Sequence, residues 1–290
     1  MTQLNRRNSL KKILMGTVAA GTLPALTVQA HQSKTPLKGN VNHSVCAWTY
    51  GFLSLDELCV AVKKIGFNAI DLVGPKGWDT LKAHNVDCSL CNGAEINIAQ
   101  GFNDPQYHAQ LIKNYTEMIP MVAKAGYKNL ICFSGNRNGM DDETGMKNCA
   151  DALKKLVGLA EKHNVVLIME LLNSRVDHKD YMCDKSAWGI ELCKMVGSAN
   201  LKLLYDIYHM QIDEGDLIRT IRNNHQYFGH YHTAGNPGRN EIDETQEINY
   251  PAVVKAILDT GYKGYIVQEF IPKASDKLAS LEQAVRICDL

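Results

Sequence analysis

The hydrophobic positions of the chain follow two alternating patterns after residue 40. Short apolar runs rich in β-branched residues are typical of buried strands, and apolar positions three to four residues apart are typical of helices. The strand pattern occurs at residues 45–50, 69–73, 86–91, 129–133, 165–171, 201–205, 227–232 and 265–268. The helix pattern occurs at residues 55–65, 78–84, 105–125, 143–163, 185–196, 217–224, 250–259 and 276–288. Ser54 is the predicted N-cap of the first helix, and Gly66 its predicted stop signal.

Eight predicted strands, each followed by a helix, imply a parallel sheet covered by helices. That number of units suits a closed barrel. An open, doubly wound sheet would usually carry a glycine-rich turn after its first strand, and the sequence WTYGF at residues 48–52 has no such turn. We therefore predict an α/β fold, a single (β/α)8 barrel at residues 41–290, preceded by a polar linker at residues 31–40.

Residues 1–30 have the composition of an export signal. They contain four basic residues and no acidic residue, followed by an apolar stretch and a small-residue cleavage site that ends at Ala30. The adjacent Arg6 and Arg7 resemble a twin-arginine signal, with Ser9 in place of the usual Phe. A general secretion signal or a membrane anchor is the alternative, but glycines and a proline interrupt the apolar stretch before it reaches the roughly 20 residues of a membrane span. We expect a periplasmic protein that meets the membrane only during export.

The charge of the chain argues against a nucleic-acid partner. Lysine and arginine together number 31, as do aspartate and glutamate. Because residues 1–30 hold four of the basic residues, the rest of the chain carries an excess of acidic residues, which repels a phosphate backbone. The sequence leaves homo-oligomerisation open.

The chain contains nine cysteines, an odd number. Most lie in apolar runs, where a thiol behaves as a small hydrophobic side chain. Export after folding would reconcile buried thiols with an oxidising compartment. The sequence does not settle whether any disulfide forms.

The last four predicted strands end on, or lead directly into, side chains that can bind a metal. These side chains are Glu170, Asp206, His232 and Glu269. Active sites of such barrels form at the carboxyl ends of the strands. A central divalent cation would compensate the cost of burying the carboxylates, and this donor set suits Mn²⁺, Mg²⁺ or Co²⁺, with Zn²⁺ as an alternative. We predict one divalent ion; four separately ion-paired strand ends are the alternative.

Four motifs surround these residues. They are YDIYHMQ at residues 205–211 with EG at 214–215, GHYH at 229–232, NPGR at 236–239 and EINY at 247–250. They are similar to motifs of the hydroxypyruvate isomerase family. That family belongs to the xylose isomerase-like barrel superfamily, which also holds ketose 3-epimerases and endonuclease IV. The resemblance extends over residues 45–273 and is strongest after Glu170.

The resemblance implies roles for the four strand-end side chains. Glu170 and Glu269 would both bind the metal and transfer protons, and Asp206 and His232 would complete the metal shell. The local chemistry agrees, because a metal bound to a carbonyl and an adjacent hydroxyl stabilises an enediolate. Two carboxylates can then remove and return the proton.

The resemblance also implies two substrate contacts. His209 would contact substrate hydroxyls, and Arg239 would reach the distal group of the substrate. His209 follows Asp206 by three residues, and we expect it on the loop after that strand; a surface histidine is the alternative. Arg239 either pairs with a carboxylate or is an ordinary loop arginine. His230 is expected inside the barrel as a supporting residue.

Two loops differ from the hydroxypyruvate isomerase pattern. The third strand leads into CNGAEINI at residues 91–98, and the fourth into SGNRNGMDDE at residues 134–143. Because these loops would shape the substrate pocket, Asn92 and Arg137 are further candidates for substrate binding. The departures leave the substrate open between small keto sugars and keto acids.

Three alternatives to a hydroxypyruvate isomerase-like enzyme follow from the same residues. An exported 3-keto-sugar or glycoside epimerase, or a β-eliminating lyase, would use the same metal site. A phosphodiesterase of the endonuclease IV type would need more histidines at the strand ends. A sugar-binding barrel without catalysis would be expected to lose Glu170 or Glu269, and both are present.

Overall fold

Eight parallel strands form the centre of the molecule in a computed structural model, which describes residues 35–290. The predicted export signal and residues 31–34 of the predicted linker lie outside the described residues. Residues Pro36–Leu290 form one compact unit. The strands are β1 Asn42–Cys46, β2 Ala69–Asp71, β3 Asp87–Cys88, β4 Asn129–Cys132, β5 Val166–Glu170, β6 Leu201–Asp206, β7 Phe228–Thr233 and β8 Tyr265–Gln268.

The strand order is that of a closed barrel. The sheet runs β3-β2-β1-β8-β7-β6-β5-β4, and every neighbouring pair is parallel. Cys91 joins the two edges: its N–H donates to the Asn129 carbonyl (2.8 Å), and its carbonyl accepts from the Ile131 N–H (2.9 Å). The predicted (β/α)8 barrel is confirmed.

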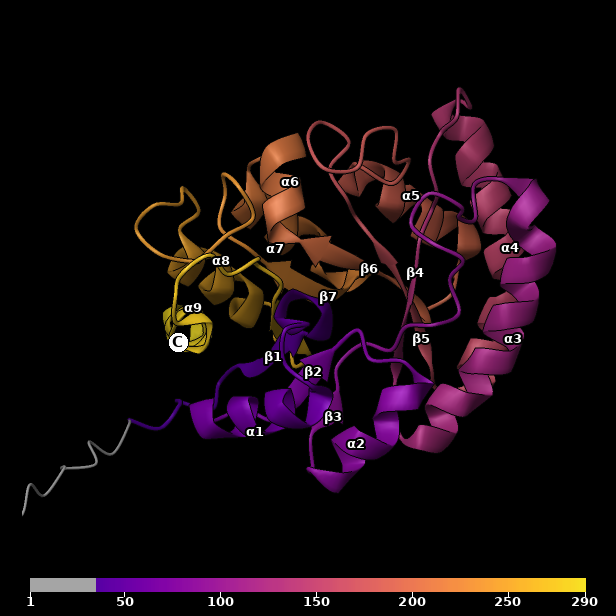
Figure 1. The fold of residues 1–290 in the computed structure, drawn as a ribbon. Helices are drawn as coiled ribbons and strands as arrows, with labels where there is room; N and C mark the ends of the chain where they lie inside the picture. Colours follow the sequence, from indigo (N-terminus) through magenta and orange to yellow (C-terminus); the bar gives the residue numbers. More distant parts are fainter. Residues whose placement is uncertain (1–34) are drawn as a thin grey trace, which may run out of the picture. The chain divides into compact units, whose positions relative to one another are not determined.

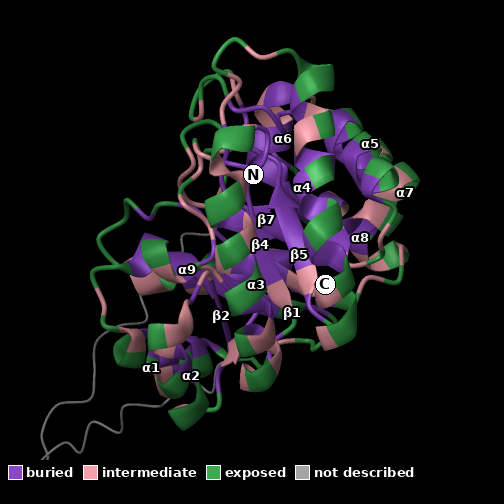
Figure 2. Ribbon diagram, turned by 90° about the vertical axis from the view of Figure 1, so that its right-hand side faces the viewer, coloured by how far each residue is buried: buried purple, intermediate pink, exposed green. Residues whose placement is uncertain are grey.

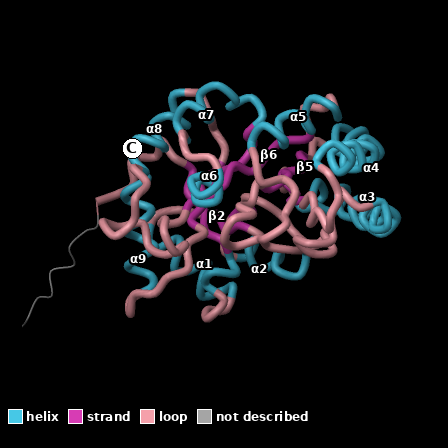
Figure 3. The backbone as a smooth tube through the Cα atoms, turned by 90° about the horizontal axis from the view of Figure 1, so that it is seen from above, coloured by secondary structure: helices cyan, strands magenta, loops and turns pink. Residues whose placement is uncertain are grey.

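Helices surround the strands (Figures 1 and 3). They are α1 Leu55–Ile65, α2 Trp78–Ala83, α3 His108–Ala125, α4 Asp142–His163, α5 Ser186–Val196, α6 Ile207–Asp213, α7 Leu217–Asn224, α8 Tyr250–Asp259 and α9 Lys277–Cys288. Helix α1 has its predicted bounds because Ser54 and Glu57 form a capping box and Gly66 follows the last turn.

The core lies between the strands and the inner faces of the helices. Figure 2 shows buried strands at the centre and helices that are exposed on their outer faces. In α1, for example, Leu58, Val62 and Ile65 are buried, as expected for residues three to four positions apart on one helix face. Each such aliphatic side chain contributes about 1.5–3 kcal/mol when buried.

Three local predictions are wrong, all at carboxyl ends of strands. The predicted strand at residues 45–50 ends at Cys46, because a 3-10 helix, Ala47–Tyr50, turns the chain and Thr49 donates a hydrogen bond to the Cys46 carbonyl (3.0 Å). The predicted strand at residues 86–91 is regular only over Asp87–Cys88. The segment after β6 is not a loop but helix α6, because the Asp206 side chain caps it by accepting from the His209 N–H (3.0 Å).

All nine cysteines are buried and carry free thiols. Among residues 35–290, no helix combines the length and the apolar character needed to cross a membrane.

Candidate metal centre

Four side chains converge at the carboxyl end of the barrel. Glu170 ends β5, Asp206 ends β6, His232 is the penultimate residue of β7, and Glu269 follows β8. One ligand-type atom of each lies within 4.8 Å of the corresponding atoms of the other three, and all four side chains are buried. The structure therefore brings together the four residues that the sequence singled out, which are called the four strand-end residues below.

The ligand-type atoms face one another, and some of them have no hydrogen-bond partner. His232 Nδ1 lies 3.0 Å from Glu269 Oε2 and 3.5 Å from Glu170 Oε1. Glu170 Oε1 is buried and forms no hydrogen bond within the described chain. An unpartnered buried carboxylate oxygen is costly. A cation among the four strand-end residues would remove that cost.

The electrostatics of the cluster also favour a cation. Burial raises the pKa of Asp206 well above its usual value, and the charge of Glu269 raises it further. Burial raises the pKa of Glu170 as well. For Glu269, burial opposes ionisation, but the charges of His232 and Arg239 outweigh it and lower the pKa well below its usual value. Three carboxylates and one imidazole fit a divalent ion such as Mn²⁺, Mg²⁺ or Co²⁺.

His209 lies on helix α6 beside the four strand-end residues, and it is fully buried. Its Nδ1 accepts a hydrogen bond from Asn173 Nδ2 (2.6 Å). Its Nε2 has no hydrogen-bond partner and lies 3.7 Å from Asp206 Oδ2. Burial lowers the pKa of His209 well below its usual value, so the ring is neutral and Nε2 carries the proton. His209 therefore offers an unused donor next to the centre.

Arg239 contacts the centre through an ion pair. Its Nη2 lies 2.7 Å from Glu269 Oε2. The guanidinium lies over two aromatic rings, 5.2 Å from the centroid of Trp48 and 5.8 Å from that of Tyr208. Arg239 thus pairs with a carboxylate, and that carboxylate belongs to the protein itself.

The structure does not bring Arg137 or Asn92 into contact with the four strand-end residues. Arg137 forms ion pairs with Asp142 (2.9 Å) and Asp184 (3.1 Å), which hold the loop after β4. Asn92 packs against the backbone of Gly74 in the loops after β2 and β3. Among the contacts within residues 35–290, no hydrogen bond or ion pair joins either residue to the centre.

Two residues of the centre were missed from the sequence. Trp48, on the 3-10 helix after β1, donates from Nε1 to Glu269 Oε1 (3.0 Å). Asp71, at the end of β2, is fully buried and contacts His230 and His232. A signal existed for Asp71, because it is the one charged residue in the apolar run 69–73. Trp48 carries no such signal. His230 lies inside the barrel, as predicted.

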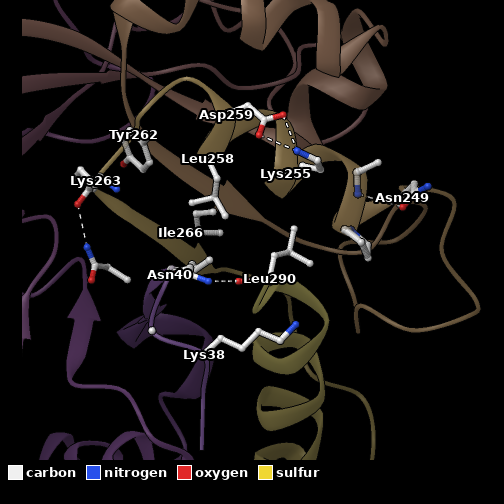
Figure 4. Close-up of a pocket in the computed structure, with 16 residues that line it drawn as sticks. Lys38, Asn40, Asn249, Lys255, Leu258, Asp259, Tyr262, Lys263, Ile266 and Leu290 are labelled. Carbon is white, nitrogen blue, oxygen red and sulfur yellow. Dashed lines mark hydrogen bonds and ion pairs between the residues drawn. The ribbon is translucent and has the colours of Figure 1, made fainter.

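A separate cavity of about 970 Å³ lies at the opposite end of strands β1 and β8 (Figure 4). It is lined by the residues that precede or begin these strands, such as Asn42 and Lys263, and by Leu258 of α8. None of the four strand-end residues lines it. This cavity is therefore distinct from the candidate metal centre.

Comparison with known proteins agrees with the fold and the motifs. The chain is 37% identical to a 2-oxo-tetronate isomerase of Cupriavidus necator over 115 residues, which cover 40% of this chain and 44% of that protein. It is 26% identical to the hydroxypyruvate isomerase of Escherichia coli over 82% of this chain and 95% of that protein. The aligned part thus spans less than half of the first relative and nearly all of the second.

A solved structure shares the fold. The crystal structure of a family 2 AP endonuclease from Brucella melitensis superposes with a TM-score of 0.74 at 21% identity, covering 83% of this chain and 97% of that one. The model of the xylose isomerase-like TIM barrel family matches residues 59–288, most of the chain. The chain therefore belongs to the xylose isomerase-like TIM barrel family.

Proposed function

We propose that the protein is a divalent-metal-dependent isomerase or epimerase that acts on a small keto sugar or keto acid. The observation that carries the proposal is the convergence of three buried carboxylates and one imidazole at the carboxyl ends of β5–β8. Two relatives whose names are those of keto-acid isomerases support the class of reaction.

The four strand-end residues would hold one divalent ion, with Mn²⁺, Mg²⁺ or Co²⁺ favoured by the donor set and Zn²⁺ as the alternative. Such an ion stabilises the negative charge that develops on a substrate carbonyl oxygen when the neighbouring carbon loses its proton. Glu170 and Glu269 have the further role of removing that proton and returning it. Both carboxylates are buried, which strengthens their electrostatic interactions with the reacting groups.

The neighbouring residues would orient the substrate and the base. The free Nε2–H of His209 can donate to a substrate hydroxyl beside Asp206. Trp48 and Arg239 each bond a different oxygen of Glu269, which fixes the orientation of that carboxylate. A base held in place by two donors is positioned before the substrate binds, which is the main requirement for efficient proton transfer.

The same groups serve isomerisation and epimerisation. Isomerisation returns the proton to the former carbonyl carbon, while a second proton moves from the adjacent hydroxyl to the former carbonyl oxygen. Epimerisation returns the proton to the original carbon from the other side, which inverts that carbon. Both outcomes begin with exchange of the proton next to the carbonyl. A sugar-binding barrel with the same fold would not catalyse this exchange.

The proposal is tested by a screen in D2O. The purified, metal-loaded protein is incubated with neutral keto sugars and with keto acids, and deuterium at the carbon next to the carbonyl is measured by NMR. We expect exchange in at least one compound and its loss after chelation. Absence of exchange in every compound by a protein that holds one divalent ion per chain would contradict the enzymatic proposal and favour the sugar-binding alternative.

We also propose that residues 1–30 direct export of the folded protein to the periplasm. The support is the adjacent Arg6 and Arg7 before an apolar stretch of small residues. Replacing both arginines by lysine should leave the precursor in the cytoplasm, measured by fractionation of cells that express the full chain. Unchanged export would instead favour the general secretion route.

A further inference from the structure

Asp71 lies beneath the candidate metal centre and is enclosed by hydrogen-bond donors. It ends β2 and is fully buried. Its Oδ1 lies 3.1 Å from His232 Nε2, and its Oδ2 lies 2.8 Å from His230 Nε2. Ser89 Oγ donates to the same Oδ2 at 2.5 Å. One carboxylate from the first half of the barrel therefore connects two histidines of β7.

These contacts determine how the ring of His232 is presented. The nitrogen that faces Asp71 is Nε2, and the nitrogen that faces Glu170 and Glu269 is Nδ1. A carboxylate accepts hydrogen bonds and cannot donate them when it is ionised. Asp71 therefore keeps a proton on Nε2, so Nδ1 is the ring nitrogen available to bind an ion among the carboxylates.

Two serines hold the carboxylate of Asp71 in addition to the two histidines. Ser89, which donates to Asp71, is itself hydrogen-bonded to Ser44 through the two hydroxyls (2.7 Å). The side chain of Asp71 is thus fixed from three sides.

We propose that Asp71 is a positioning residue for the metal centre: by accepting from His232 Nε2 it makes Nδ1 the metal-binding atom and orients the ring. The inference rests on the proposed metal site. His230 shares the carboxylate and keeps it from rotating. Hydrogen bonds of this kind to a metal-bound histidine typically change metal affinity about 10–100-fold.

The alternative to a positioning role is that Asp71 and His232 bind a second metal ion together with Cys46. Cys46 Sγ lies 3.6 Å from Asp71 Oδ1 and 4.0 Å from His232 Nε2, so these three residues also form a buried group of ligand-type atoms. The positioning role requires a proton on His232 Nε2, whereas a second ion would replace that proton. The two arrangements therefore differ in metal stoichiometry and in the protonation of Nε2.

The first experiment uses the unaltered protein. Zinc is diamagnetic, so the zinc-loaded protein labelled with ¹⁵N can be examined by two-bond ¹H–¹⁵N NMR, which distinguishes the two ring nitrogens of each histidine. We expect one zinc ion per chain, with His232 protonated at Nε2 and bound through Nδ1. Binding through Nε2, or two ions per chain, would overturn the inference. A chain that binds no divalent ion would instead contradict the proposed function.

The second experiment uses Asp71→Asn, measured by competition with a chelator for Co²⁺ or Zn²⁺. An amide keeps the size of the side chain but presents an N–H to one of the two histidines. We expect metal affinity to fall about 10–100-fold. The matched control is Asp289→Asn, which alters another buried carboxylate that lies beside a buried histidine, His43 (3.5 Å).

The control separates positioning from general loosening of the fold. Asp289→Asn should lower the stability of the apoprotein while its metal affinity stays within about twofold of the unaltered protein, because neither Asp289 nor His43 contacts the four strand-end residues among the described interactions. Equal loss of affinity in both variants, or unchanged affinity in Asp71→Asn, would overturn the positioning role.

Discussion

The two halves of the barrel contribute to the centre in different ways. Strands β5–β8 end in the four strand-end residues, which face one another directly. Strands β2 and β3 are short, and residues at or just after the ends of β1 and β2 bond to those four instead: Trp48 to Glu269, and Asp71 to His232. The second half thus supplies the buried carboxylates and the imidazole, and the first half supplies hydrogen-bond partners to two of them.

This difference explains why the first half is less regular. Strand β6 has six residues, whereas β3 has two, and the barrel is closed there by the single residue Cys91. The chain after β1 leaves the sheet at Cys46 and forms the 3-10 helix that carries Trp48. Departing from the strand places the indole N–H against Glu269. Variants in the two halves should therefore fail in different ways.

The largest loss is expected in the second half, at the two carboxylates that we propose transfer protons. Glu170→Gln and Glu269→Gln keep an oxygen that can bind metal but cannot accept a proton at neutral pH. We expect deuterium exchange into the substrate to fall by about 10²–10⁴-fold even with excess metal. Near-normal exchange by metal-saturated Glu269→Gln would contradict the assignment of that residue.

A different failure is expected for Asp206→Asn, also in the second half. Asparagine caps helix α6 as well as aspartate does, so the substitution removes charge and leaves the helix intact. Loss of a hydrogen-bond partner of a metal ligand lowers metal affinity at least about tenfold, and the loss at Asp206 should be larger. Added metal should restore most of the exchange rate. Exchange that stays low at saturating metal would show that Asp206 does more than bind the ion.

A smaller effect is expected in the first half, at Trp48. Trp48→Phe keeps an aromatic ring beside Arg239 but removes the donor to Glu269 Oε1. The indole is 47% exposed, so the loss should be about 1.5 kcal/mol, or about tenfold in exchange rate, with metal affinity little changed. An unchanged rate would show that Arg239 alone orients the carboxylate.

The smallest effect on the centre is expected outside it, at the start of helix α1. Ser54→Ala removes the N-cap of the capping box. We expect unfolding by urea to show a loss of about 1 kcal/mol in stability, with metal affinity and exchange unchanged. A change in exchange would mean that the first half orients the centre through its helices as well as through Trp48 and Asp71.

Local features of the molecule could be predicted from the sequence, whereas contacts between distant residues could not. Helices α1 and α8 were predicted with their observed bounds because their caps and apolar periods are local. The convergence of the four strand-end residues was predicted because each ends or directly follows an apolar strand. Helix α6 was missed because five of its seven residues, spread around the helix, are buried, which removes the apolar period.

The hydrogen bonds of Asp71 and Trp48 to the centre could not be predicted for another reason. Asp71 and His230 are separated by 159 residues, and Trp48 and Glu269 by 221. No local pattern links such residues before the barrel closes. Arg239 shows the same limit, because the sequence allows its pairing with a carboxylate but does not reveal that the carboxylate is Glu269.

The proposed function requires that the four strand-end residues hold one divalent ion on which proton exchange depends. The direct test is to remove metal with a chelator, dialyse the protein, and add Mn²⁺ in steps while deuterium incorporation into an exchanging substrate is measured. We expect no exchange without metal and a linear rise that stops at one ion per chain. Full exchange by the metal-free protein would contradict it.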